Sequence, residues 1–232
     1  MPKIIFRPAP TPPPFVPPGP ANKFLTFTAK ENGCRIGYIY FSEDYTVQDA
    51  GLNIEYSLDN GQTWNTYSMS TTESGAQMIS LNNGESVMFR GNNANLAYYL
   101  ESDDDYQFTK FVIEGQMAAS GDVSSLLNGI GGVLTAPTYC YASMFDGCTS
   151  LIQAPTLPAT TLVVNCYALM FDGCTSLNHV ECLATNISST NSTNNWLSNV
   201  ASIGTFLKAA SMSNWPSGVS GIPNGWTVQD KS

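Results

Sequence analysis

Short runs of alternating apolar and polar residues occupy the first half of the chain. They lie at residues 24–29, 35–41, 54–58, 86–91 and 108–113. Alternation of this kind is the pattern of a strand that buries one face. Asn60-Gly61 follows the third run, and this dipeptide between alternating runs is a strong hairpin signal. Several short strands with turn residues between them predict an antiparallel β-sandwich over residues 22–115.

A duplicated segment dominates the second half of the chain. The sequence CYASMFDGCTSL at residues 140–151 returns as CYALMFDGCTSL at residues 166–177, with eleven of twelve positions identical. An offset of 26 residues is in the range of solenoid repeats. A degenerate third copy begins near Trp196-Leu197 and lacks the cysteines. We therefore predict a short solenoid over residues 116–232 whose last copy is a cap.

Apolar residues recur every third position from Phe145 to Leu157, and the second copy repeats the spacing. In the third copy Val200, Ile203 and Phe206 continue it. We expect each copy to form a helical turn, then a turn at Asp-Gly where glycine accepts a positive φ, then a short extended rung. The structural repeat residues are Cys140, Met144, Phe145, Gly147, Cys148, Leu151, Cys166, Met170, Phe171, Gly173, Cys174 and Leu177.

The repeated segment resembles the BspA-like leucine-rich repeats. The pattern that carries the resemblance is CYxxMFxGCTSLxxAPxLPA, and residues 204–227 resemble the terminal cap of such arrays. The segment IEYSLDNGQTW at residues 54–64 is similar to the Ig-like sandwich domain that often precedes them. The resemblance implies a leucine-rich repeat fold on surface or virion proteins of gut Bacteroidota and their phages. It implies an architecture and adhesion, and it assigns no chemistry.

Residues 1–21 are expected to form a separate extended arm. Nine of the 14 prolines lie here, and such a run favours polyproline II over a helix or a sheet interior. Both charged residues of the arm are basic, and apolar residues flank the prolines. A stiff linker is the alternative interpretation. We expect the arm to anchor the chain on a partner through Lys3, Ile4, Ile5, Phe6, Arg7, Phe15 and Val16.

Charge and composition narrow the classes of partner. Charged residues make up 12% of the chain, and the net charge is −9. This balance argues against nucleic acid, whose backbone attracts clustered Lys and Arg, and against an anionic membrane surface. No stretch reaches the roughly 20 apolar residues of a membrane span. Prolines also cut off the apolar run after Met1, so we expect a native start and no secretory signal.

Six cysteines lie at positions 34, 140, 148, 166, 174 and 182. The repeat offset places Cys140 over Cys166 and Cys148 over Cys174, which favours two short ladders of buried thiols. Disulfides are an alternative, because neighbouring coils lie about 5 Å apart. A metal site is a weaker alternative, because zinc ligands usually follow a closer Cys-x₂₋₄-Cys spacing.

Residues with catalytic or ligand-binding chemistry are few. The single histidine, His179, is expected to face solvent, and the sequence offers no nucleophilic triad. Asp103-Asp104-Asp105 could attract a hard cation, although we favour a solvated turn. Asp146 and Asp172 recur with the repeat and are interpreted as turn formers. We therefore predict no enzyme activity, no cofactor and no metal.

Aromatic side chains are the remaining candidates for binding, because their rings stack on sugars. The alternative for most of them is a place in the core of the strands or of the cap. The candidates are Trp64, Tyr67, Tyr98, Tyr99, Trp196, Trp215 and Trp226.

The resemblance, together with the stiff arm and the missing export signal and catalytic chemistry, implies a structural protein of a tailed phage virion, a head fibre or capsid decoration on the exterior of the capsid. The arm would bind a capsid protein or another virion protein, and the repeats would face a glycan or protein of the host surface or mucus. We expect a homo-oligomer assembled in the bacterial cytoplasm, where thiols stay reduced. A bacterial cell-surface adhesin and a carbohydrate-binding module are the alternatives.

Overall fold

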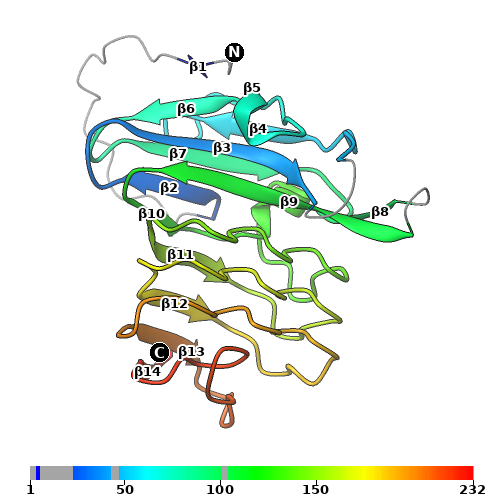
Figure 1. Ribbon diagram of the computed structural model, residues 1–232, viewed down its shortest axis with the longest axis vertical. Coiled ribbons are helices and arrows are strands. Elements are labelled where there is room, and N and C mark those ends of the chain that lie inside the picture. The colour runs from blue at the N-terminus through cyan, green and yellow to red at the C-terminus, as the bar shows by residue number, and fades with distance from the viewer. Residues whose placement is uncertain (1–3, 6–22, 43–46, 101–103, 232) are drawn as a thin grey trace.

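The computed structural model describes residues 4–5, 23–42, 47–100 and 104–231 (Figure 1). The chain is mostly β, and its C-terminal part is a β-solenoid of about three turns. In the part of the chain that is described, no helix is both long and apolar enough to cross a bilayer. We call residues 23–120 the two-layer part and residues 121–231 the solenoid.

The two-layer part consists of two β-sheets. The first sheet has the strand order β1-β6-β3-β9-β8, where β1 is added from the N-terminal end of the chain. The second sheet contains β10-β2-β7-β4-β5 in this part and extends beyond β10. The strands are β1 (Ile4–Ile5), β2 (Leu25–Ala29), β3 (Cys34–Phe41), β4 (Ile54–Ser57), β5 (Asn65–Thr66), β6 (Met78–Leu81), β7 (Ser86–Gly91), β8 (Tyr98–Leu100), β9 (Asp105–Glu114) and β10 (Met117–Ser120), with a 3-10 turn η1 (Glu73–Gly75) before β6. The five predicted strands correspond to β2, β3, β4, β7 and β9.

The two sheets bury aromatic side chains between them. The ring of Phe111 on β9 lies 4.8 Å from that of Phe27 on β2 and 5.4 Å from that of Phe89 on β7. These side chains alternate with outward-facing residues along their strands, as the sequence pattern predicts. All three rings are fully buried, so burial of apolar surface joins the layers.

The predicted hairpin at Asn60-Gly61 is confirmed. Strands β4 and β5 pair antiparallel, and the two turn residues have φ values of 59° and 82°. Asp59 fixes the turn by accepting hydrogen bonds from the backbone N–H groups of Gln62 and Thr63. These bonds and others from Ser57 and the Thr63 hydroxyl outweigh the opposing effect of burial and lower the pKa of Asp59 to about 2.

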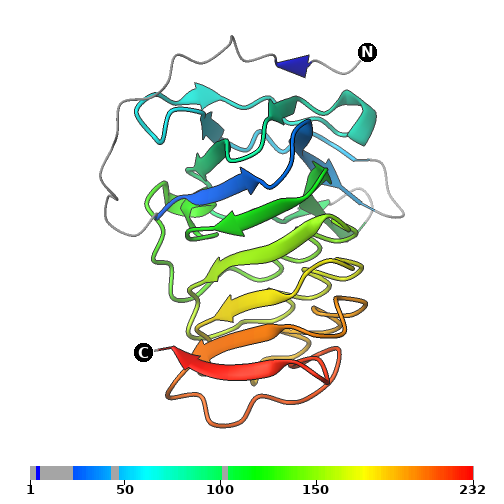
Figure 2. The same cartoon turned by 90° about the vertical axis from the view of Figure 1, so that its left-hand side faces the viewer.

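The second sheet continues without a break into the solenoid. Strand β10 pairs antiparallel with β2 on one side and parallel with β11 on the other. The sheet then runs through β11 (Leu151–Leu157), β12 (His179–Cys182), β13 (Thr205–Ala209) and β14 (Thr227–Lys231), all parallel. Figure 2 shows these rungs stacked one above another. The expected domain boundary at residue 116 falls between β9 and β10, and one sheet and one hydrophobic core extend across both of the predicted domains.

A short helix follows β10 in the chain. Helix α1 (Ser125–Asn128) ends at Gly129, whose φ of 73° gives the left-handed C-cap. The Ser125 hydroxyl donates to the carbonyl of Phe89 and accepts from the N–H of Leu25. The helix is thus tied to β2 and β7, and it closes the open end of the two-layer part.

In each coil of the solenoid, a stretch with unusual backbone angles precedes the strand that forms the rung. Three residues of each coil, spaced four apart, have a positive φ, and the set repeats in the next coil. The positions are Tyr139, Ser143 and Gly147 in the first coil, Asn165, Leu169 and Gly173 in the second, and Asn191, Asn195 and Asn199 in the third. Between them, N–H groups alternate between a carbonyl three residues back and a carbonyl of the next coil, as in Met144 to Tyr141 and Phe145 to Met170. This alternation satisfies the backbone of a stretch that is neither helix nor strand.

The backbone of this stretch differs from the repeat geometry that we predicted. The Tyr-Ala-x-Met-Phe segment was expected to be helical, but a left-handed residue every fourth position interrupts any helix. The glycines of the predicted Asp-Gly turns do have a positive φ, 67° at Gly147 and 71° at Gly173. Ile203 does not continue the inner apolar spacing, because its side chain is 77% exposed beside the cap.

Stacked aromatic rings run along the interior from one part into the other. Tyr38 lies on Phe111 at 4.1 Å, Phe111 on Phe145 at 5.3 Å, and Phe145 on Phe171 at 5.1 Å. The last two pairs are almost parallel, at 9° and 4°. Phe111 belongs to β9 and Phe145 to the first coil, so this column crosses the join between the two parts.

A second column fills the other side of the coils. Tyr141 packs on Tyr167, Tyr167 on Trp196, and Trp196 on Trp215 of the cap, with centroid distances of 5.7, 6.0 and 5.5 Å. The Trp196 indole also donates to the carbonyl of Gly221 at 2.8 Å. The third coil thus keeps the register of the repeat, and its Trp196 side chain binds the cap.

We expect the left-handed positions to respond oppositely to substitution. Leu169→Asn should stabilise the chain by about 0.5–1 kcal/mol, because asparagine accepts positive φ more readily than leucine. Gly173→Val should destabilise it by more than about 1 kcal/mol, because a β-branched residue is strained at this φ. Chemical denaturation of both variants measures the changes.

Ile152→Asn on β11 is the matched control, since this residue is also half-buried but has an ordinary extended backbone. It should lose stability through lost apolar burial. A Leu169→Asn variant that loses as much as Ile152→Asn would show that backbone strain at residue 169 is negligible.

Candidate functional site

The expected anchor residues lie almost entirely outside the described part of the chain. Lys3, Phe6, Arg7, Phe15 and Val16 are in this group. The backbone of Ile4 and Ile5 forms strand β1, which pairs parallel with Met78 and Ile79 of β6. This end of the chain therefore lies at the edge of the first sheet, far from the last coils (Figure 1).

The structural repeat residues all lie where stacking requires them. Cys140, Met144, Phe145, Cys148, Leu151 and their second-copy equivalents are at most 3% exposed. Gly147 and Gly173 stack in the turn, where a Cβ on Gly173 would lie 3.5 Å from the Cα of Gly147. The repeat motif is therefore an interior and a turn, and its side chains offer no surface to a ligand.

The six cysteines are free and buried. The Cys148 thiol donates to the carbonyl of Phe111 at 3.2 Å, and the Cys174 thiol donates to the carbonyl of Phe145 at 3.0 Å. Each thiol thus satisfies a carbonyl in the layer before it, and the first of these bonds crosses from the solenoid to β9. The structure therefore agrees with buried thiols and contains no disulfide between these cysteines.

Burial keeps the five thiols of the solenoid protonated. It raises the pKa of Cys148, Cys166 and Cys182 to about 12 and raises the pKa of Cys140 and Cys174 as well. At Cys148 the positive charge of Lys110 opposes this effect. Since the thiolate is the nucleophile and the metal ligand, these cysteines are chemically inert in the folded chain.

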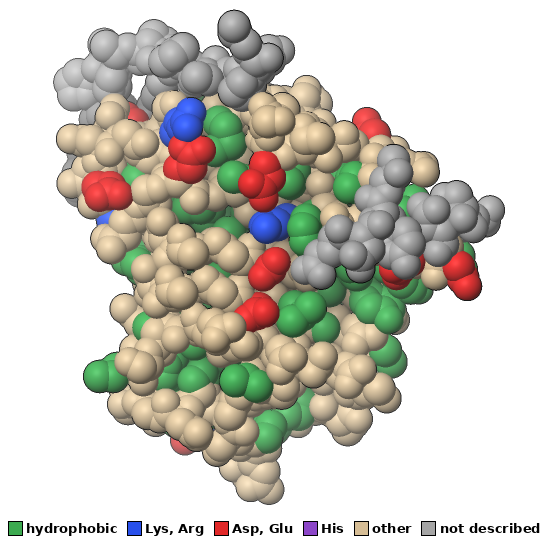
Figure 3. Space-filling view, in the orientation of Figure 1, with side chains coloured by type: hydrophobic (Ala, Val, Ile, Leu, Met, Phe, Trp, Pro, Cys, Tyr) green, Lys and Arg blue, Asp and Glu red, His purple; other side chains and the backbone are tan. Residues whose placement is uncertain are grey.

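The acidic candidates and the histidine do not converge. Asp103 lies outside the described residues, Asp104 accepts a hydrogen bond from the Tyr99 hydroxyl, and His179 is half-buried on the rung β12. Within the described ranges, no three His, Cys, Asp or Glu side chains are grouped to hold a metal ion. Charged side chains are sparse on the face shown in Figure 3, and acidic ones outnumber basic ones there.

The repeat aspartates have structural partners. The Lys110 ammonium lies 3.9 Å from Asp146 and 3.6 Å from Glu73, and 4.7 Å from the centre of the Phe41 ring. Asp172 accepts a hydrogen bond from the Asn199 side chain at 3.2 Å. Lys110 is on β9 and Asp146 in the first coil, so this pair links the two parts at the surface.

The aromatic candidates separate into core and surface. Tyr67 and Trp196 belong to the core, and Trp64 packs on Phe24 and under the Arg90 guanidinium. Tyr98 is half-buried, and its hydroxyl bonds the Gln48 carbonyl. Tyr99 is half-exposed at the end of the β8–β9 hairpin. Trp215 and Trp226 line a common pocket, although the Trp226 side chain is only 7% exposed.

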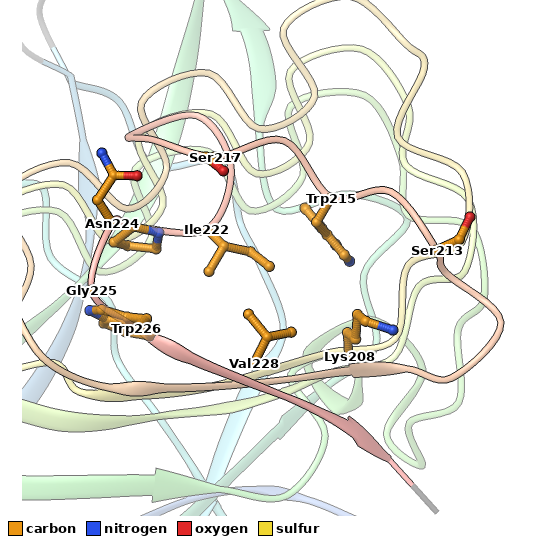
Figure 4. Close-up of a pocket in the computed structure, with 10 residues that line it drawn as sticks. Lys208, Ser213, Trp215, Ser217, Ile222, Asn224, Gly225, Trp226 and Val228 are labelled. Carbon is orange, nitrogen blue, oxygen red and sulfur yellow. The ribbon is translucent and has the colours of Figure 1, made fainter.

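That pocket has a volume of about 350 Å³ and lies between β13, β14 and the loop that precedes β14 (Figure 4). Figure 4 shows Ile222 and Val228 between the two indole rings, with Lys208 beside Trp215. Ser213, Ser217 and Asn224 add polar groups to the lining. A smaller hollow of about 210 Å³ adjoins it and shares Pro223 and Asn224.

Both tryptophans are held firmly. The Trp226 indole donates to the carbonyl of Ala201 at 2.7 Å, and its ring covers Gly204, where a Cβ would come within 2.6 Å of it. Trp215 stacks on Trp196 and meets the edge of Phe206 at 5.2 Å. The walls of the pocket are therefore formed before any ligand arrives.

The polar groups of the lining are unevenly satisfied. Lys208 forms an ion pair with Asp230 of β14. The buried Nε1–H of Trp215 has no hydrogen-bond acceptor among the described residues. A buried donor without an acceptor costs about 1–3 kcal/mol. Figure 4 shows this nitrogen turned toward Lys208, so two donors meet at one end of the pocket.

The sequence predicted only part of this site. Trp215 and Trp226 were candidates because of their type, but Lys208, Ile222, Asn224 and Val228 carried no signal of their own. They converge because the last coil is shorter than the others, with a rung spacing of 22 residues from Thr205 to Thr227 in place of 26 from His179 to Thr205. An irregular final spacing is a signal that could have directed attention to this end.

Comparisons with protein-family models, with curated proteins and with solved structures found no match.

The buried thiols give a direct prediction. Native protein at pH 8.5 should resist iodoacetamide, whereas unfolded protein should be alkylated at all six cysteines. Cys148→Ala should cost about 1–2 kcal/mol, because it removes a buried group and leaves the Phe111 carbonyl without its donor. Cys148→Ser, which keeps a donor, is the matched control and should cost less. Intact-mass spectrometry and chemical denaturation check both statements.

The same thiols predict the alkaline limit of stability. Unfolded thiols ionise near their ordinary pKa of 9.0, while the folded ones stay protonated up to about pH 12. The unfolded state therefore binds fewer protons in this window, and the free energy of unfolding should fall as pH rises from about 9 to about 12. Rapid alkylation of native protein, or a melting temperature that drops with dithiothreitol, would contradict the thiol assignment.

Proposed function

We propose that the chain is a structural protein of a tailed phage virion, a head fibre or capsid decoration that displays an adhesive repeat domain. The observation that carries the proposal is the placement of the two ends. Strand β1 lies at the edge of the first sheet, and the last coil lies at the other end of the molecule (Figure 1). The pocket is formed by residues of this last coil and its cap. A protein anchored by its N-terminal arm would hold that pocket away from the particle.

The continuous β-sheet supports a display role. One nine-stranded sheet runs from its edge strand β5 in the two-layer part to its edge strand β14 in the solenoid, and one large cluster of buried side chains includes residues of both parts. A close-packed core of this kind transmits force and resists bending between its ends. The chain between the anchor and the far pocket is thus a rigid spacer.

The repeat motif supports the family assignment within this proposal. We take the solenoid to be a BspA-like leucine-rich repeat array with its terminal cap, and the two-layer part to be an Ig-like sandwich. Such a protein would be assembled in the bacterial cytoplasm and placed on the capsid exterior as a homo-oligomer. The arm residues Lys3 to Arg7 would meet a capsid protein or another virion protein.

A carbohydrate-binding module is the second candidate, and the pocket between Trp215 and Trp226 favours it. In that role the arm would be a linker to another protein domain and not an anchor on a capsid. The two candidates differ in what the arm does.

Deletion of residues 1–20 tests the anchor. The truncated protein should fold with a nearly unchanged melting temperature, because β1 contributes only two residue pairs to the first sheet. It should be absent from purified particles, as measured by mass spectrometry of virions. The charge reversal Lys3→Glu with Arg7→Glu should lower occupancy, while Lys23→Ala, which removes an exposed lysine just outside the arm, should not. Truncated protein at normal occupancy on particles would refute the anchor and favour the module.

A further inference from the structure

The pocket of the last coil has the shape and rigidity of a small-molecule site. Its volume of about 350 Å³ is in the lower part of the range for ligand pockets, about 300–1,000 Å³. Ile222 and Val228 form an apolar floor between two fixed indoles (Figure 4). Val228 is 45% exposed although it belongs to a strand, so apolar surface at this floor remains in contact with solvent.

The polar groups at one end of the pocket favour a ligand with acceptor oxygens. Trp215 Nε1–H is a donor that no described residue satisfies, and Lys208 is a second donor beside it. The exposed Asn224 side chain offers both a donor and an acceptor at the rim. Because the Trp215 nitrogen is buried, the ligand oxygens would meet Lys208 and Asn224.

The charge of the pocket favours a neutral ligand. Lys208 is the one ionised side chain in its lining, and its charge is balanced by Asp230. The chain as a whole carries a net charge of −9, which repels anions. A ligand that combines apolar C–H faces with neutral hydroxyls fits these walls, since its C–H face packs on an indole while its oxygens meet the donors.

We propose that this pocket binds one neutral pyranose unit of a saccharide, with its apolar face against the tryptophan walls and its hydroxyls on Lys208 and Asn224. This inference deepens the proposed function and rests on it for its setting, because it names the ligand class of the displayed end. The sugar contact itself depends only on the soluble folded chain.

Indole N–H signals in ¹H–¹⁵N correlation spectra test the proposal on the full-length protein. The probes are methyl β-glucopyranoside, methyl β-galactopyranoside, methyl α-mannopyranoside and N-acetylglucosamine, each titrated to about 100 mM, since a single sugar unit is expected to bind with a Kd of about 1–10 mM. At least one probe should shift the Trp215 and Trp226 signals saturably and leave the Trp64 signal of the two-layer part unchanged. The Trp215 signal is assigned from its loss in Trp215→Phe.

Matched variants and probes separate a built site from weak surface contact. Asn224→Ala should raise the Kd at least about threefold by removing a hydrogen bond. Asn83→Ala, an equally exposed amide in the turn between β6 and β7, should leave it unchanged. Glycerol, which has hydroxyls but no ring, should give no saturable shift. The absence of a saturable Trp215 shift with all four pyranoses would overturn the proposal, as would equal binding by Asn224→Ala or tighter binding of glucuronate.

The outcome separates this proposal from the virion assignment. Sugar binding is measured on isolated protein, while the arm is tested by occupancy on particles. A pocket that binds no pyranose leaves the anchoring result intact, and an arm that fails to anchor leaves the sugar titration intact.

Discussion

The contact between Phe111 and Phe145 is the interaction on which the rest of the structure depends. Phe111 comes from an antiparallel sheet, and Phe145 comes from the first coil of a parallel solenoid, yet their rings stack at 5.3 Å and 9°. A solenoid coil cannot bury its interior alone, so its first coil needs a surface that resembles another coil. Strand β9 supplies that surface with the ring of Phe111, with its carbonyl as acceptor for the Cys148 thiol, and with its N–H as donor to the Met144 carbonyl. The two-layer part thereby acts as the N-terminal cap of the array.

The opposite end of the array is closed in a different way. Trp196 replaces the methionine of the repeat, stacks between Tyr167 and Trp215, and donates to the loop that covers it. A cap built on large indoles leaves space that the regular coils do not have, and this space is the pocket. The residues that end the solenoid are therefore the same residues that could bind a ligand. This arrangement places stability and recognition at one site.

Much of the architecture could be predicted from the sequence, because strong local patterns determine it. The alternating runs gave the five main strands, and the 26-residue offset gave the register of the coils. The asparagines at positions 165, 191, 195 and 199 were not predicted, although all four have a positive φ. The positive-φ positions recur every four residues, and a search for the apolar periodicity of helices or strands does not detect this spacing. Ile203 was misplaced because it occupies the position of Leu177 in the 26-residue repeat, yet its side chain is exposed while that of Leu177 is buried. The shared sheet was also missed, because the pairing of β10 with β2 and β11 depends on residues far away in the chain.

The candidate site was harder to predict for a physical reason. A pocket depends on side chains from β13, β14 and a loop, and no local pattern states that these converge. The tryptophans were visible as candidates, but sequence alone could not separate Trp196 in the core from Trp215 and Trp226 at the pocket. Their difference comes from their neighbours, because Trp196 is fully buried between Tyr167 and Trp215 of the cap.

The central claim is that the two-layer part and the solenoid share one core and unfold as one cooperative unit. Native-state hydrogen exchange on the wild-type chain and on Phe145→Leu tests it most directly. The account predicts that the substitution lowers the free energy of exchange by the same amount in β3 of the two-layer part and in β12 of the solenoid. A loss confined to β12, with β3 unchanged, would contradict it and show two parts that fold independently.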